Sequence, residues 1–186
     1  MQNKFKNKYR ILSTRLQTWD YSKNGAYFIT ICTQNREHFF GNIQNGMMQL
    51  SEIGKFAERY WLEIPEHFPF VELGNFVVMP HHVHGILIIN NIPNSVETRQ
   101  CLVSTIKLNT TIGSSRFQNQ GKNTISSIVG SYKSIVSKMS RQTHSNFAWQ
   151  SRFHDHIIRN SKSFENIQNY IFENPLNWKN DKFYKI

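Results

Sequence analysis

Two histidines separated by one residue are the clearest chemical feature of the sequence. His82 and His84 flank Val83 within the stretch VVMPHHVHGILII. Side chains alternate along an extended strand, so both imidazoles should point to one face while Val83 points to the other. Two imidazoles on one face can hold a divalent cation. A pair of packed histidines is the alternative, because so short a motif also arises by chance.

A second group lies near the end of the sequence, where Tyr170 and Asn174 are four residues apart in NIQNYIFENPLNW. On a helix, that spacing puts both side chains on the same side, one turn apart. Phe164, Ile167 and Ile171 would anchor this helix to a sheet, so that the phenol and the amide could converge on the histidines. Alternatively, Tyr170 is an amphipathic core residue whose hydroxyl is satisfied locally.

Tyr132, in the string SYKSIVSK, is the main rival as a nucleophile. It belongs to a different predicted helix, and the residue four positions further on is Val136, which cannot bind a metal ion. Of these two tyrosines, only Tyr170 is followed one helical turn later by a residue that could bind a metal ion.

The elements that must position these residues follow from apolar periodicity and from turn residues. The pattern predicts a strand over 26–33, a hairpin turning at Asn45-Gly46, a helix capped by Ser51 and ended by Pro65, strands over 71–79 and 84–90 joined by a link at 80–83, a helix from Thr124, a strand over 152–159 and a helix over 163–174. The order is then β-α-β-β-α-β with a closing helix. It indicates an α+β, ferredoxin-like fold: an antiparallel sheet with helices on one face and a C-terminal helix that carries Tyr170.

The chain is expected to form one domain over 1–186, and its composition is strongly basic. Its 22 Lys and Arg against 12 Asp and Glu give a net charge of +10 and a pI near 9.8, which favours a polyanionic partner such as nucleic acid. Basic residues cluster in an N-terminal arm, 1–19, and on the outer face of the helix that begins at Thr124. Those expected to contact phosphates are Lys4, Lys6, Lys8, Arg10, Arg15, Lys133, Lys138 and Arg141. A solvated surface with a disordered tail is the simpler alternative.

The polar stretch at 92–121, the two cysteines and the short apolar runs bear on the cellular location expected for the protein. Residues 92–121 are polar without periodicity and are expected to form a long loop. Cys32 and Cys101 form no CxxC pair, so neither a disulfide framework nor a zinc ribbon is indicated, which fits a reducing cytoplasm. The apolar runs are too short to span a bilayer, and no secretory signal is recognised. We therefore expect a cytoplasmic, nucleoid-associated protein without a membrane partner.

Three blocks of the sequence resemble one known family when taken together. They are DYSKNGAYFITICTQNREHFFG, FVVMPHHVHGILI and WQSRFHDHIIRNSKSFENIQNYIFENPLNW. In this order they resemble the single-tyrosine HUH transposases, in particular the REP-associated tyrosine transposases related to the small insertion-sequence enzymes. The resemblance implies that His82 and His84 are metal ligands and that Tyr170 is the nucleophile. It puts Asn174 at the position of the third ligand, where many relatives have glutamine, and His81 where similar sequences commonly have asparagine.

The activity that this resemblance implies is transesterification at a DNA phosphodiester. A transposase of this kind nicks and rejoins single-stranded or hairpin DNA through a 5′-phosphotyrosine. The expected cofactor is a divalent cation, Mg²⁺ or Mn²⁺. No nucleotide cofactor is needed, because the phosphotyrosine conserves the bond energy. His156 and Arg159, within the DHIIRN string typical of this group, are expected to orient the site or hold DNA.

Oligomeric state and two other functions stay open at this point. One tyrosine per chain performs one nick, so full excision needs two active sites, and the resemblance is compatible with either a monomer or a homodimer. The same order of elements builds non-catalytic RRM-like nucleic-acid-binding modules, although the aromatic K/R-G-F/Y-G/A-F-V-x-F/Y pattern is absent here. A related HUH replication initiator or relaxase would share the chemistry but not the GAYFITICT and YIFENP blocks.

Overall fold

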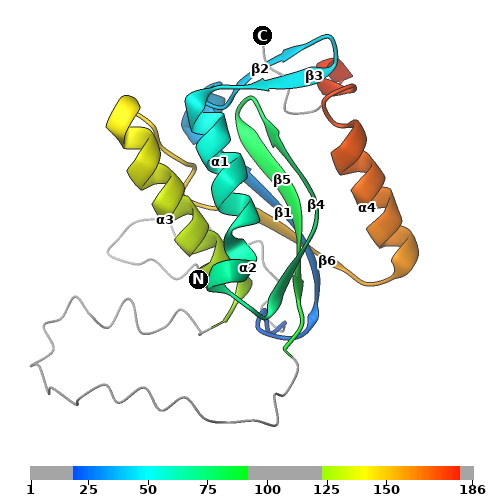
Figure 1. Cartoon of the computed structure of the whole chain (residues 1–186). Coiled ribbons are helices and arrows are strands. Elements are labelled where there is room, and N and C mark those ends of the chain that lie inside the picture. Colours follow the sequence, from blue (N-terminus) through cyan, green and yellow to red (C-terminus); the bar gives the residue numbers. More distant parts are fainter. Residues whose placement is uncertain (1–18, 92–122, 181–186) are drawn as a thin grey trace, which may run out of the picture.

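The computed structural model describes residues 19–91 and 123–180, which are the coloured parts of Figure 1. The N-terminal cations Lys4, Lys6, Lys8, Arg10 and Arg15 and the predicted loop 92–121 lie outside the described residues. The roles expected for them stay predictions.

A four-stranded antiparallel sheet forms the centre of the fold. Its strands are β1 (Gly25–Cys32), β4 (Val71–Met79), β5 (His82–Ile89) and β6 (His154–Ile158), in the order β4-β5-β1-β6, and every neighbouring pair is antiparallel. The α+β class and the antiparallel sheet expected from the sequence are confirmed. Several boundaries differ by one or two residues, and the one that bears on the site is that of β5, which starts at His82 rather than at His84 because His82 pairs with both neighbouring strands. The link between β4 and β5 is therefore only Pro80 and His81.

Two helices, α1 (Glu52–Leu62) and α3 (Ile125–Thr143), cover one face of this sheet (Figure 1). Each begins at the residue that the sequence predicted. The Ser51 hydroxyl accepts a hydrogen bond from the Gly54 N–H at 3.1 Å, and Thr124 forms a capping box with Ser127. These bonds satisfy backbone N–H groups that have no partner inside the first helical turn.

Pro65 does not end α1 as predicted. The helix stops at Leu62, and Pro65 lies in the first turn of a separate short helix, α2 (Ile64–His67). Proline is tolerated there because a first-turn N–H has no helical acceptor in any case.

The main hydrophobic core lies between the sheet and these helices. Trp61 of α1 is fully buried and meets Tyr132 of α3 edge to face, with ring centroids 5.3 Å apart. The same indole lies against Gly85 of β5, where a Cβ atom would be only 2.3 Å from the ring. Gly85 therefore allows α1 to pack closely against the strand that carries both histidines.

A small hairpin of β2 (Gly41–Gln44) and β3 (Met47–Leu50) turns at Asn45-Gly46, as predicted. Both turn residues have positive φ, 51° and 74°, the conformation that an Asn-Gly pair adopts in two-residue hairpins. The hairpin lies beside the C-terminal end of the last helix (Figure 1), where a side chain at Gly46 would collide with Leu176.

The last helix, α4 (Ser161–Glu173), packs on the other face of the sheet, against β4 and β5 (Figure 1). Asn160 caps it by accepting a hydrogen bond from the Ser163 N–H at 2.8 Å. Its anchor is a separate, smaller apolar cluster built on Ile86, Ile158 and Ile171. The sheet thus divides a large core on one side from the α4 side.

Two 3₁₀ turns complete the described elements, η1 (Gln34–Arg36) and η3 (Trp178–Asn180). Among the helices of residues 19–91 and 123–180, none combines the length and the apolar character needed to cross a membrane.

Candidate functional site

The two predicted ligand histidines lie side by side on the sheet face that α4 covers. They alternate along β5 with Val83, which belongs to the large core on the other face. Their ring centroids are 4.4 Å apart, and the side chains of His82 and His84 are 0% and 1% exposed. Burial of two adjacent polar rings requires each to have hydrogen-bond partners.

His84 has a polar partner at each ring nitrogen. Its Nδ1 lies 2.9 Å from the hydroxyl of Thr30, the residue directly opposite on β1, and its Nε2 lies 3.3 Å from the hydroxyl of Tyr170. Phe28 stacks on the imidazole with ring centroids 5.2 Å apart and meets the Tyr170 ring edge-on at 6.1 Å. Thr30 and Phe28 therefore fix the plane in which His84 faces the phenol.

Tyr170 reaches this point from α4, and the amphipathic pattern of the helix explains why. Phe164, Ile167 and Ile171 pack into the small apolar cluster on the sheet, which leaves the phenol directed at β5. Tyr170 is 39% exposed, so one side of its ring contacts His84 and the other is open to a large substrate. The structure thus brings the phenol and the histidine pair together.

Asn174 lies one turn beyond Tyr170, at the C-terminal cap of α4. Its side chain is 2% exposed, with a fully buried Oδ1 atom. Its backbone stays helical, at φ −56° and ψ −43°, so Pro175 does not unwind the helix before this residue. The side chain therefore offers a buried neutral oxygen at the end of the helix that carries the phenol.

Sequence reasoning missed an aromatic cluster beside His82. The ring of His81 is fully buried, with its centroid 5.2 Å from those of both His38 and Trp178 and 5.0 Å from that of His82. Trp178 belongs to η3 and is almost fully buried, and burial lowers the pKa of His38. The available signal for Trp178 was its place at the end of the last resembling block, shortly after Asn174.

Tyr132, the rival nucleophile, lies on the opposite side of the sheet. Its ring is 2% exposed within the large core, and its hydroxyl donates to the Ala57 carbonyl at 3.0 Å. Burial raises the pKa of Tyr132, which disfavours the phenolate. A macromolecular substrate cannot reach this oxygen in the folded chain.

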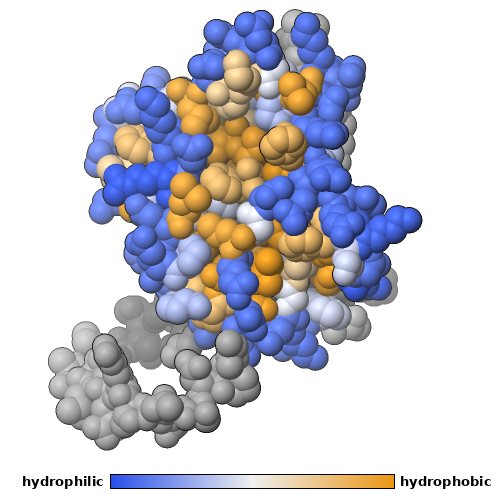
Figure 2. All heavy atoms as spheres, turned by 45° about the vertical axis from the view of Figure 1, so that its right-hand side comes forward, coloured by the Kyte–Doolittle hydropathy of each residue, from blue (hydrophilic) through white to orange (hydrophobic). Residues whose placement is uncertain are grey.

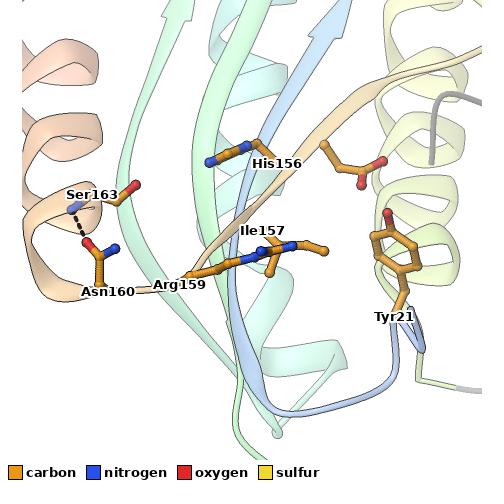
Figure 3. A pocket seen from close by; sticks show the side chains of 7 residues that line it. Tyr21, His156, Ile157, Arg159, Asn160 and Ser163 are labelled. Atoms are coloured by element: carbon orange, nitrogen blue, oxygen red, sulfur yellow. Dashed lines mark hydrogen bonds between the residues drawn. The ribbon is translucent and has the colours of Figure 1, made fainter. Parts of the chain in front are cut away.

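His156 and Arg159 line an open pocket of about 470 Å³ at the β6 edge of the sheet. Both side chains are exposed, and His156 lies opposite Phe28 in the sheet register. In Figure 3 the Arg159 side chain extends across Ile157 in the direction of Tyr21. His156 therefore neighbours Phe28, but neither His156 nor Arg159 is part of the Phe28, His84 and Tyr170 group.

Of the three helix cations expected to face phosphates, Lys138 and Arg141 are exposed. Lys133 lines the same groove but is partly buried, and its contact with phosphates stays a prediction. Its ammonium donates to the Gln150 carbonyl at 2.6 Å, and burial lowers its pKa. Lys133 therefore fastens the segment that follows α3 to the helix.

Two shallow grooves meet at residues 149–151. One is lined by Lys138 and Arg141 of α3, and the other by Arg36 of η1 and Arg152, which precedes β6. Together with the partly buried Lys133, five cations line these two adjoining grooves, as expected for a surface that follows a phosphate backbone.

The surface on the α4 side combines apolar and polar regions. Figure 2, which turns this side toward the viewer, shows apolar side chains gathered within a border of hydrophilic ones. Exposed apolar residues of α4, the segment after it and the hairpin include Phe172, Leu176 and Met47.

The donors in the site fit a cation held by two imidazoles and one amide oxygen. Within the described part of the chain, no three His, Cys, Asp or Glu side chains are grouped to hold a metal ion. A third protein ligand would then be a different kind of donor, and Asn174 has a buried oxygen one helical turn beyond Tyr170. Imidazole and amide oxygen are both established donors for divalent ions.

Similar proteins are known in Haemophilus influenzae. No protein-family model matches the chain. An uncharacterised Haemophilus protein is 36% identical over 174 residues, which span 92% of each chain. A second one, provisionally named a REP-associated tyrosine transposase, is 24% identical over 157 residues, 84% of this chain and 73% of its own.

A solved structure agrees with these sequence matches. It is that of a REP-associated tyrosine transposase bound to a REP hairpin, and it covers 89% of this chain with a TM-score of 0.57 and 20% identity. The likeness extends over 74% of that protein. The chain is thus a relative of the uncharacterised Haemophilus protein, is similar in sequence to the provisionally named REP-associated tyrosine transposase, and shares the fold of the solved one.

Proposed function

We propose that this protein is a DNA strand transferase that nicks and rejoins single-stranded or hairpin DNA, with Tyr170 as its nucleophile. One observation carries the proposal: the Tyr170 hydroxyl lies 3.3 Å from Nε2 of His84, whose ring is 4.4 Å from that of His82. A half-exposed phenol beside two buried imidazoles has little use in packing alone. It is the arrangement expected of a nucleophile activated beside a metal ion.

The reaction is a transesterification. The Tyr170 oxygen attacks the scissile phosphorus and loses its proton, the bond from phosphorus to the 3′ oxygen breaks, and the 3′ oxygen leaves with a proton. The products are a 5′-phosphotyrosine and a free 3′-hydroxyl. The reverse reaction joins that 5′ end to another strand, so no nucleotide cofactor is required.

The side chains around Tyr170 have separate tasks in this scheme. If the Nδ1–H of His84 donates to the Thr30 hydroxyl, then Nε2 has the free lone pair: without a cation it accepts the hydrogen bond of the phenol, and a bound cation would take the lone pair in place of the phenol. His82, His84 and Asn174 are the residues that would hold the cation. Mg²⁺ or Mn²⁺ bound there would supply a Lewis acid for the phosphate and favour the phenolate.

The DNA path follows from exposed groups at the β6 edge and on α3, the helix on the opposite face of the sheet from Tyr170. His156 and Arg159 would hold the strand on one side of Tyr170, and the groove with Lys138 and Arg141 would hold a hairpin stem by its phosphates. The sheet order β4-β5-β1-β6 supports a ferredoxin-like platform, and α4 adds the nucleophile to it. A single phenol per chain means that complete excision requires two active sites, which a homodimer would provide.

The experiment is incubation of the full chain with end-labelled hairpin DNA and Mn²⁺, followed by a denaturing gel. The wild type should give a covalent protein–DNA adduct and Tyr170→Phe none. Tyr132→Phe is the matched control and should form the adduct, because its hydroxyl is in the core. An adduct with Tyr170→Phe would overturn the assignment of the nucleophile. Hairpin binding without any wild-type adduct would instead identify a nucleic-acid-binding module.

A further inference from the structure

His81 and His82 are adjacent in the chain and their rings are in polar contact. The two Nδ1 atoms lie 3.2 Å apart, and both side chains are fully buried. A hydrogen bond between two ring nitrogens needs one N–H and one lone pair. The direction of this bond therefore determines which nitrogen of His82 carries its proton.

Only one direction of this hydrogen bond is compatible with His82 as a metal ligand. A neutral imidazole that binds a cation through Nε2 carries its proton on Nδ1, and that N–H requires an acceptor. His84 fits this pattern, since its Nδ1 faces the Thr30 hydroxyl and its Nε2 faces Tyr170. In His82, Nδ1 faces His81 and Nε2 is fully buried, so the acceptor must be Nδ1 of His81.

We propose that His81 is a positioning residue: its Nδ1 accepts the His82 Nδ1–H and so keeps His82 in the tautomer whose Nε2 lone pair can bind the cation. The inference rests on the proposed function, because it takes His82 as a ligand. Asparagine is the conservative replacement that keeps such an acceptor. The amide oxygen of asparagine is attached to Cγ, as Nδ1 of histidine is, and can accept the same bond.

The surroundings of His81 hold its ring in place for this task. The imidazole packs against the rings of His38 and Trp178, each with its centroid 5.2 Å away, and these two rings also contact each other at 6.2 Å. Its backbone carbonyl accepts hydrogen bonds from the Thr33 N–H at 2.9 Å and the Thr33 hydroxyl at 3.1 Å. The His81 ring therefore cannot rotate without displacing His38 or Trp178, and the two hydrogen bonds from Thr33 hold its backbone in place.

The first test reads the tautomer directly in the metal-free protein. Long-range ¹H–¹⁵N spectra of the ¹⁵N-histidine-labelled full chain identify which nitrogen of His82 is protonated. We expect Nδ1–H in the wild type and in His81→Asn, and loss of this preference in His81→Leu, which has no acceptor. His38→Leu is the matched control: it removes a neighbouring ring but leaves the Nδ1–Nδ1 contact, so the tautomer should persist.

The second test measures Mn²⁺ affinity by electron paramagnetic resonance of the free ion. His81→Leu should weaken binding about 10–100-fold, the usual effect of losing a partner of a metal-bound histidine. His81→Asn should restore wild-type affinity, which a purely space-filling role would not explain. Hairpin affinity should be the same in all variants. Circular dichroism identifies any variant that fails to fold.

An Nε2–H tautomer of His82 in the wild type overturns the proposal, even if the leucine variant does not fold. Equal Mn²⁺ affinity of folded His81→Leu and wild type does so as well. Failure of the proposed function would look different. In that case the DNA adduct would be absent while the His82 tautomer still followed the acceptor at position 81.

Discussion

Replacement of Gly85 by alanine tests how tightly the histidine-bearing strand is packed. A Cβ atom at this position would lie 2.3 Å from Cζ2 and 2.8 Å from Cε2 of Trp61, and 3.0 Å from Cβ of Phe76. Ordinary contact begins at 3.4 Å, so the indole or the strand must move by about 1 Å. Trp61 is fully buried, and close-packed interiors leave little room for such a shift.

The expected magnitude is the difference between two effects. Overpacking of this kind destabilises by about 1–3 kcal/mol. Gly85 does not have a left-handed φ, so alanine also gains about 0.4–1 kcal/mol by restricting the unfolded chain. We expect Gly85→Ala to lower the free energy of unfolding by about 1–2 kcal/mol, which for a domain of this size lowers Tm by about 2–8 °C.

Urea and thermal unfolding measure this loss, and a double-mutant cycle with Trp61→Phe assigns its cause. The smaller ring leaves space, so the alanine penalty should shrink by at least about 0.5 kcal/mol in the Trp61→Phe background. Gly130→Ala is the matched control: this helical glycine has nothing within 4 Å of its Cβ position, and alanine should stabilise it by about 0.5–1 kcal/mol. A stabilising Gly85→Ala, or an equal penalty in both backgrounds, would refute the reasoning.

Three further predictions follow from the site and its surface. Tyr132→Phe should destabilise the chain by about 1–3 kcal/mol, because the Ala57 carbonyl loses its buried donor, and should retain DNA cleavage. Burial raises the pKa of Tyr132, so as pH rises above the ordinary pKa of 10.0 the unfolded chain loses this proton before the folded chain does. The free energy of unfolding therefore falls with rising pH in this range. Unfolding curves should show a weaker alkaline decline in Tyr132→Phe, which lacks this group. His82→Ala and His84→Ala should each abolish cleavage and leave hairpin binding nearly intact in gel-shift assays, whereas loss of folding would favour packed histidines. Lys138→Ala and Arg141→Ala should each lower the slope of log affinity against log salt by about 1 in anisotropy titrations, and an unchanged slope would exclude phosphate contacts there.

Local signals in the sequence predicted much of the fold. The Ser51 cap, the Asn45-Gly46 turn and the strands of the sheet depend on neighbouring residues only, and the structure contains each of them. The alternation that puts His82 and His84 on one face is equally local. The class of the fold was therefore accessible without coordinates, whereas the pairing of the phenol with the histidines joins residues 86 apart and was expected from the three resembling blocks.

Contacts between distant segments explain what the sequence did not predict. Lys133 was expected to be free, but its exposure depends on residue 150, whose carbonyl binds the ammonium. The cluster of the His38, His81 and Trp178 rings joins three segments far apart in the chain, and no periodicity of the sequence predicts it. Pro65 was predicted to end the helix that Ser51 caps, although proline is equally suited to the first turn of a new helix.

The light anchoring of α4 has a consequence for strand exchange. α4 buries a single residue, Ile171, whereas α1 buries four and α3 six. Amide protons of α4 should therefore exchange with deuterium through local opening, at a lower free energy than those of the helices on the large core. If Tyr170 carries a DNA end as proposed, α4 could then move away from the sheet and bring that end to a second strand while the rest of the domain stays folded.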